Sequence, residues 1–171
     1  ALVFTSPLVA GRRVFVLGAD RAVGAYDAAS GRKLWNQQRP GEPLVLQQAG
    51  VLLPVGDTLV AGLAGRLAGL QPANGAIRWE VPIATPRGTN DVERLVDLVA
   101  SASRDGDSVC VRAFQAAVGC VNAARGNVLW TKPAVGAVGL GGDDRLVFGT
   151  EADGKVIAWA RGTGERAWVS E

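Results

Sequence analysis

The sequence predicts an all-β fold, a β-propeller built from four-stranded antiparallel blades, on three observations. A glycine followed four positions later by a tryptophan occurs four times in the 171 residues. Short apolar runs rich in β-branched residues precede each copy, and turn pairs such as Asn74-Gly75 separate the runs. The repeat tryptophans are 44, 51 and 38 residues apart, which is about the length of one propeller blade.

The repeat glycines and tryptophans are interpreted as structural residues. A glycine supplies the positive φ of a tight turn between the third and fourth strands of a blade. The tryptophan then lies on the outermost strand, where its ring can fill the wedge between adjacent blades. We expect packing, and not a cofactor-binding floor, from all eight residues: Gly31, Trp35, Gly75, Trp79, Gly126, Trp130, Gly164 and Trp168.

Residues 1–171 are interpreted as one partial propeller. The four blades are predicted at residues 1–41, 42–81, 82–132 and 133–171. The third is the longest because of an insertion at residues 82–95, and insertions in repeat folds map to loops that frequently form binding faces.

Composition excludes several other classes of protein. Hydrophobic residues make up 48% of the chain, which favours a packed core over disorder, and the net charge of +2 indicates neither nucleic-acid nor membrane-surface binding. Histidine is absent, which removes the commonest general base and metal ligand. With no nucleophile, phosphate-loop or dinucleotide motif either, we expect no catalytic residue, no metal and no cofactor.

The first residues look like part of a strand, and neither a signal peptide nor a lipidation cysteine is recognisable. We therefore expect this fragment to carry no targeting signal of its own.

Cys110 and Cys120 flank the expected turn between the second and third strands of the third blade. This position allows them to be cross-strand neighbours, so a disulfide and a pair of reduced thiols both remain open. Because disulfides between adjacent strands are often strained, two buried reduced thiols are favoured.

The first repeat narrows the family. Residues 25–35 read AYDAASGRKLW, which resembles the Ala-x-Asp-x-x-x-Gly-x-x-x-Trp repeat of quinoprotein-type propellers. Residues 88–97, GTNDVERLVD, resemble the Glu/Asp-Arg-Leu-x-Asp loop of the BamB family of outer-membrane assembly proteins. The resemblance spans essentially the whole chain, which would correspond to the middle four blades of an eight-bladed ring.

The resemblance to the BamB family implies a non-catalytic scaffold of the outer-membrane β-barrel assembly complex. Such proteins dock on the periplasmic POTRA domains of BamA and help to deliver unfolded outer-membrane proteins. The resemblance also implies a location at the periplasmic face of the outer membrane, through a lipid anchor that this fragment lacks.

The family's docking surface uses neighbouring loops of two consecutive blades. A Leu-x-Leu-Arg stretch is matched by Leu44, Leu46 and Gln47, with glutamine in place of arginine. An acidic pair is matched by Asp97 and replaced at Val99, and Arg94 lies in the same loop. Leu44 and Leu46 share one face of a strand, so they form either an exposed apolar patch or part of the core.

The charged residues of the second loop have a simpler interpretation. Arg94 and Asp97 are three positions apart and would then pair with each other on the surface, which contributes little to stability.

Two alternative functions use the same fold. A quinoprotein dehydrogenase would need adjacent cysteines and a calcium site, whereas the cysteines here are ten residues apart and no acidic cluster has calcium-loop spacing. A generic interaction propeller would bind unrelated proteins or glycans, and capture of POTRA domains would distinguish it from the preferred function.

Four blades do not close an eight-bladed ring, so the first and last blades should expose apolar sheet faces. Exposed apolar patches favour association. We expect this fragment to self-associate, with two copies completing each other.

Overall fold

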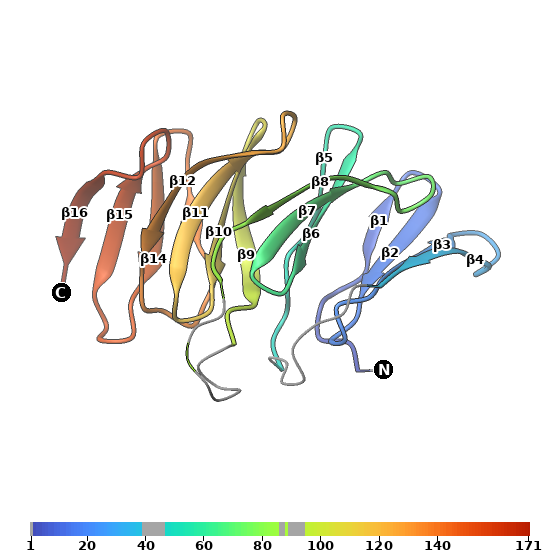
Figure 1. Cartoon of the computed structure of the whole chain (residues 1–171), viewed down its shortest axis with the longest axis horizontal. Helices are drawn as coiled ribbons and strands as arrows, with labels where there is room; N and C mark the ends of the chain where they lie inside the picture. Colours follow the sequence, from blue (N-terminus) through green and yellow to red (C-terminus); the bar gives the residue numbers. More distant parts are fainter. Residues whose placement is uncertain (1, 39–46, 86–87, 89–94) are drawn as a thin grey trace.

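The computed structural model describes residues 2–38, 47–85, 88 and 95–171, and these residues form strands and no helix (Figure 1). Four antiparallel sheets of four strands confirm the predicted fold class. The first sheet contains β1 (Leu8–Ala10), β2 (Arg13–Leu17), β3 (Val23–Asp27) and β4 (Lys33–Gln37). The second contains β5 (Leu52–Val55), β6 (Thr58–Leu63), β7 (Arg66–Leu70) and β8 (Ile77–Pro82).

The remaining two sheets repeat the same order of strands. The third contains β9 (Leu98–Asp105), β10 (Ser108–Ala113), β11 (Ala117–Asn122) and β12 (Asn127–Pro133). The fourth contains β13 (Gly141–Gly142), β14 (Leu146–Thr150), β15 (Val156–Ala160) and β16 (Arg166–Ser170). We call these sheets blades 1 to 4. Blades 2 and 3 each run one residue past the boundary expected for them, through Pro82 and Pro133.

The blades stand side by side in chain order, so blades 1 and 4 lie at the two ends of the row (Figure 1). Blades 2 and 3 are buried on both faces, as strands β6 and β10 show, because each of these blades has a neighbouring blade on either side. Strand β2 instead mixes buried and half-buried residues, because blade 1 has a neighbouring blade on only one side among the described residues. No described segment forms a helix with the length and hydropathy of a membrane span.

Each internal pair of blades is joined through a repeat tryptophan and a repeat glycine. The indole N–H donates to a backbone carbonyl of the next blade, at 2.9 Å for Trp35, 3.0 Å for Trp79 and 2.7 Å for Trp130. A Cβ built on Gly75, Gly126 or Gly164 would overlap the tryptophan ring of the preceding blade. All four repeat glycines also have a φ between +74° and +76°, so the position needs glycine for its backbone as well as for its lack of a side chain.

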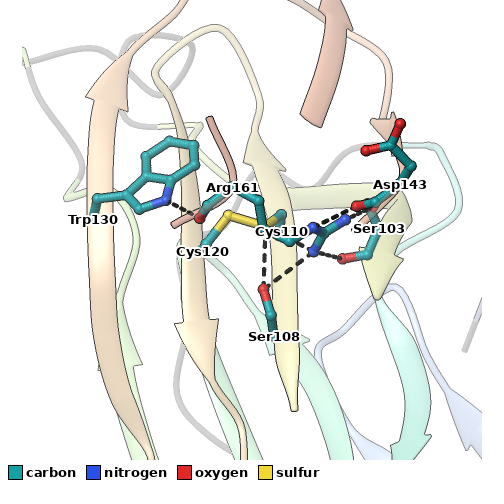
Figure 2. The surroundings of a disulfide bond; sticks show 7 residues. All are labelled: Ser103, Ser108, Cys110, Cys120, Trp130, Asp143 and Arg161. Atoms are coloured by element: carbon teal, nitrogen blue, oxygen red, sulfur yellow. Dashed lines mark hydrogen bonds between the residues drawn. A yellow bond between two sulfur atoms is a disulfide. The ribbon is translucent and has the colours of Figure 1, made fainter. Parts of the chain in front are cut away.

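Cys110 and Cys120 form a disulfide, so the expectation of two reduced thiols is wrong (Figure 2). The two residues lie directly opposite each other on β10 and β11, with their Cα atoms 4.0 Å apart. In that position both side chains point to the same face of the sheet and meet. Both are fully buried under Trp130, which pairs with Cys120 in the register of the outer strand.

Arg161 braces the same interface from blade 4 (Figure 2). Its carbonyl accepts the Trp130 N–H, while its guanidinium donates to the Ser108 hydroxyl and contacts Cys110 Sγ at 3.3 Å. The guanidinium also donates to the Ser103 hydroxyl and, at 2.7 Å, to the backbone carbonyl of Asp143, which lies between β13 and β14. Burial lowers the pKa of Arg161, and nearby aspartates oppose that effect.

Candidate functional site

The candidate site lies on one end of the blades. In an antiparallel four-stranded blade, the segment that enters the first strand and the turn between the second and third strands lie at the same end. This end therefore carries the segments that precede β5 and β9 and the turns β2–β3, β6–β7 and β10–β11. We call it the entry face.

The segment before β5 is joined to the start of β9 by backbone contacts. Gly50 and Val99 form an antiparallel bridge, and the Ala100 N–H donates to the Ala49 carbonyl at 3.0 Å. Residues 49–50 and the first residues of β9 thus lie side by side. Gln47, exposed, is the first described residue of one of these segments.

Asp97 is held by an ion pair that crosses from blade 1 to blade 3. Arg21, in the β2–β3 turn, donates to Asp97 Oδ1 at 2.9 Å, and the two side chains are 6% and 18% exposed. The Asp97 carbonyl accepts the Phe114 N–H from the β10–β11 turn at 2.9 Å. The expected surface partner Arg94 lies outside the described residues, and a buried arginine 76 positions away pairs with the carboxylate. Such a pair orders the entry face, because both ends are largely removed from water.

The other residues singled out in the sequence divide into two groups. Val99 is 1% exposed and lies within β9, so its side chain contributes to the core under the entry face. Leu44 and Leu46 lie outside the described residues, so the choice between a patch and a core position stays open for them.

A small cavity lies beneath these segments. Its volume is about 40 Å³, and its lining includes Thr5, Arg21, Gln48 and Asp97. Small-molecule and cofactor sites generally measure ~300 Å³ or more, so this space has the size of a water site and is too small for an organic cofactor. In the part of the chain that the structure describes, no three His, Cys, Asp or Glu side chains gather as metal ligands.

Sequence reasoning missed the buried arginines. Arg21, Arg112 and Arg161 are all buried, and each spans from one blade to another. Arg112 is the clearest case: it sits in the apolar strand β10, where its guanidinium donates to Glu151 and to two backbone carbonyls of the following blade. An arginine inside an otherwise apolar strand is the signal that would have identified it.

A family model described as outer membrane protein assembly factor BamB matches residues 1–170. The protein of that name from Bordetella pertussis (strain Tohama I) is 33% identical over 95% of this chain and 42% of its own length. The one from Burkholderia pseudomallei (strain K96243) is 32% identical over 99% of this chain and 45% of its own length. The chain therefore spans less than half the length of these relatives.

Solved structures agree on the fold. The crystal structure of BamB from Moraxella catarrhalis superposes with a TM-score of 0.87 at 20% identity, over 96% of this chain and 50% of that one. A quinohemoprotein alcohol dehydrogenase from Comamonas testosteroni superposes with a TM-score of 0.74 at 14% identity, over 99% of this chain and 35% of that one. At these identities the likeness concerns the fold alone. The family match across residues 1–170 decides membership: this chain belongs to the family of the outer membrane protein assembly factor BamB.

Proposed function

We propose that this chain is part of a non-catalytic scaffold subunit of the outer-membrane β-barrel assembly complex. Its entry face docks on the periplasmic POTRA domains of BamA, and the complex helps unfolded outer-membrane proteins to reach and enter the membrane. The match to the BamB family over residues 1–170 is the observation that carries this proposal. A lipid anchor on the whole protein would hold the propeller at the periplasmic face of the outer membrane.

The arrangement of the entry face supports this function. The residues that precede β5 contact the start of β9 through Gly50–Val99 and Ala49–Ala100, which supports a surface that one partner can cover. Gln47 is exposed and available for contact. We assign Asp97 two roles. It supports the entry face, because Arg21 holds its carboxylate, and it contributes to the contact, because 18% of its side chain remains exposed. Val99, which is buried, supports the face from below.

Leu44 and Leu46 are proposed as the apolar anchors of this contact, and Arg94 as a flanking charge. An apolar anchor surrounded by polar residues is typical of the energetic centre of a protein interface. Gln47 stands where the family has an arginine, so the charge-assisted part of the contact is weaker in this chain.

Binding of purified BamA POTRA domains, followed by isothermal titration calorimetry, tests the proposal. Leu46→Asp should weaken binding at least tenfold, because it places a charge in the apolar centre. Gln47→Arg should strengthen binding severalfold, because it restores a charge-assisted hydrogen bond. Arg125→Ala is the control, since Arg125 is exposed on the β11–β12 turn at the opposite end of blade 3.

Two results would contradict the proposal. One is the absence of binding by the wild-type chain at POTRA concentrations in the hundreds of micromolar. The other is an equal loss of affinity in Leu46→Asp and Arg125→Ala, which would place the contact elsewhere on the molecule.

A further inference from the structure

Arg161 differs from the other two buried arginines in having no carboxylate partner. Arg21 donates to Asp97. Arg112 donates to Glu151. Arg161 is 4% exposed, yet none of the ion pairs between described residues includes it. A buried cation is costly unless an anion accompanies it, so the groups around Arg161 indicate where that anion forms.

The acceptors around the Arg161 guanidinium are neutral (Figure 2). They are the backbone carbonyls of Ser103 and Asp143, the hydroxyls of Ser103 and Ser108, and Cys110 Sγ. The carboxylate of Asp143 accepts instead from backbone N–H groups of its own turn. Of these acceptors only the sulfur becomes an anion near neutral pH, and it does so when the disulfide is reduced.

The two sulfur atoms of the disulfide have different surroundings. Cys110 Sγ lies 3.3 Å from a guanidinium nitrogen of Arg161 and 3.8 Å from the Ser108 hydroxyl oxygen. Cys120 pairs with Trp130 of the outer strand, and no described side chain donates to its sulfur. A thiolate at Cys110 would therefore contact a cation, whereas burial keeps Cys120 a neutral thiol.

The other charged groups that face Arg161 are three aspartates. Asp105 ends β9, and Asp143 and Asp144 lie between β13 and β14. Their negative charges oppose an anion at Cys110. All three are exposed, so water and salt screen them, while the guanidinium touches the sulfur in the interior. The local balance favours an anion at Cys110.

We propose that the Cys110–Cys120 disulfide is a reversible redox element, whose reduction gives a folded protein with a Cys110 thiolate paired with Arg161. The covalent link within blade 3 is exchanged for an ion pair between blades 3 and 4, so these blades stay docked in both redox states. Arg161 lies in the β15–β16 turn, at the end of the blades opposite the entry face, and the inference does not depend on the docking proposed there.

A dithiol reductant supplies the two electrons. Its thiolate attacks Cys120 Sγ, the S–S bond breaks, and the electron pair of that bond stays on Cys110 Sγ as the thiolate. The second thiolate of the reductant then attacks the reductant's own sulfur in the mixed disulfide and releases Cys120, which takes up a proton. The reductant becomes a disulfide, and one of its two protons goes to solvent. Both protein sulfurs are buried, so the attack follows a local opening, and Arg161 sets the equilibrium.

Thiolate absorbance near 240 nm, which needs no access by a reagent, tests the proposal. The wild type is reduced with dithiothreitol and exchanged into oxygen-free buffer, and circular dichroism checks that the strands persist. The folded, reduced chain should show about one thiolate at pH 7. The same chain unfolded in guanidinium chloride should show only a few per cent of each thiol ionised.

Two single-cysteine variants form a matched pair. Cys120→Ala retains the thiol beside Arg161, and Cys110→Ala retains the other. The thiolate fraction at pH 7 should be at least tenfold higher in Cys120→Ala, because only its sulfur contacts the guanidinium.

Substitutions of Arg161 in the Cys120→Ala chain separate charge from packing. Arg161→Gln should lower the thiolate fraction at least tenfold, whereas Arg161→Lys should retain most of it. Arg145→Gln is the control, since it removes an exposed positive charge from the same end of blade 4 and should change the fraction less than twofold. In the chain with both cysteines, Arg161→Gln should shift the equilibrium with dithiothreitol at least tenfold toward the disulfide.

Three results would overturn the proposal. The first is a reduced wild type that loses its strands. The second is a folded, reduced wild type with less than about a tenth of a thiolate per chain at pH 7. The third is a thiolate fraction that is equal in the two single-cysteine variants or unchanged by Arg161→Gln.

Discussion

Blades 1 and 3 place a repeat tryptophan at the same position but support it with different chemistry. In blade 1 the ring of Trp35 rests on Phe15 and Ala25, and the ring remains half-buried. In blade 3 the ring of Trp130 rests on the Cys110–Cys120 disulfide and is 7% exposed. The outer turn also differs, because blade 1 has Asp27 where blade 3 has Asn122.

The difference shows that the repeat specifies the ring, the glycine and the carbonyl, and leaves the layer beneath the ring to each blade. Blade 1 fills that layer with a large and a small apolar residue. Blade 3 fills it with a covalent link, and the guanidinium of Arg161 in blade 4 contacts the Cys110 sulfur atom. The interface between blades 3 and 4 should therefore be more strongly coupled than the interface between blades 1 and 2.

The largest effect is expected from truncating the rings. Trp130→Ala should lower the free energy of unfolding by about 3–5 kcal/mol, as for other buried tryptophans. Trp35→Ala should cost less, because its ring is half-buried and removes less apolar area from water. Denaturation by guanidinium chloride, monitored by far-ultraviolet circular dichroism, measures both.

Trp130→Phe separates the ring from its hydrogen bond. It keeps most of the apolar surface but removes the donor to the Arg161 carbonyl, so it should cost about 1 kcal/mol, plus a small packing term. Equal losses for Trp130→Ala and Trp35→Ala would contradict the comparison between the two blades.

The next largest effect is expected from the disulfide. The double variant Cys110→Val/Cys120→Ala fills the layer with two apolar side chains, as blade 1 does, without a covalent link. It should lose about 2–3 kcal/mol, because the link closes a short loop and restricts the unfolded chain. The midpoint of denaturation with and without reductant measures this loss, and only the wild type should respond to reductant.

Thiol titration provides the control for that experiment. The wild type unfolded without reductant should show no reactive thiol, since both cysteines of the chain are bonded. Two reactive thiols per chain would contradict the disulfide.

The blades and the positions of their tryptophan rings could be predicted from the sequence, whereas the disulfide and the ion pair of Asp97 could not. The Gly-x-x-x-Trp spacing predicted the blades and the place of each ring. A glycine at a positive φ marks a tight turn, and a large apolar ring at a fixed distance from it needs a neighbouring blade to cover it. The ten-residue spacing of Cys110 and Cys120 allowed a cross-strand pair without requiring one, because the bond depends on their exact pairing across the turn. Arg21 and Asp97 are 76 positions apart, so their ion pair depends on how three blades are placed, which no local pattern encodes.

The smallest effect concerns the turn of blade 1 and its dependence on pH. Asp27 Oδ1 accepts bonds from the Ser30 N–H, the Ser30 hydroxyl and the Ala29 N–H. These bonds, that of the Ser30 N–H foremost, lower the pKa of Asp27 below its ordinary value. A carboxyl whose pKa is lower in the folded state contributes stability above its unfolded pKa, and this contribution is lost as the pH falls through the folded pKa. The relevant window lies below about pH 4.

Asp27→Asn removes the titration but keeps the acceptor oxygen, as Asn122 does in blade 3. The wild type should melt at a slightly higher temperature than Asp27→Asn at pH 7, and the gap should narrow as the pH falls below about 4. Asp143 and Asp153, whose pKa values are also lowered by backbone N–H groups, titrate in both proteins and cancel in the difference. Asn122→Asp is the reciprocal variant and should add acid sensitivity to the turn of blade 3. A gap between wild type and Asp27→Asn that stays constant from pH 7 to pH 3 would mean that the two turns do not differ in their electrostatics.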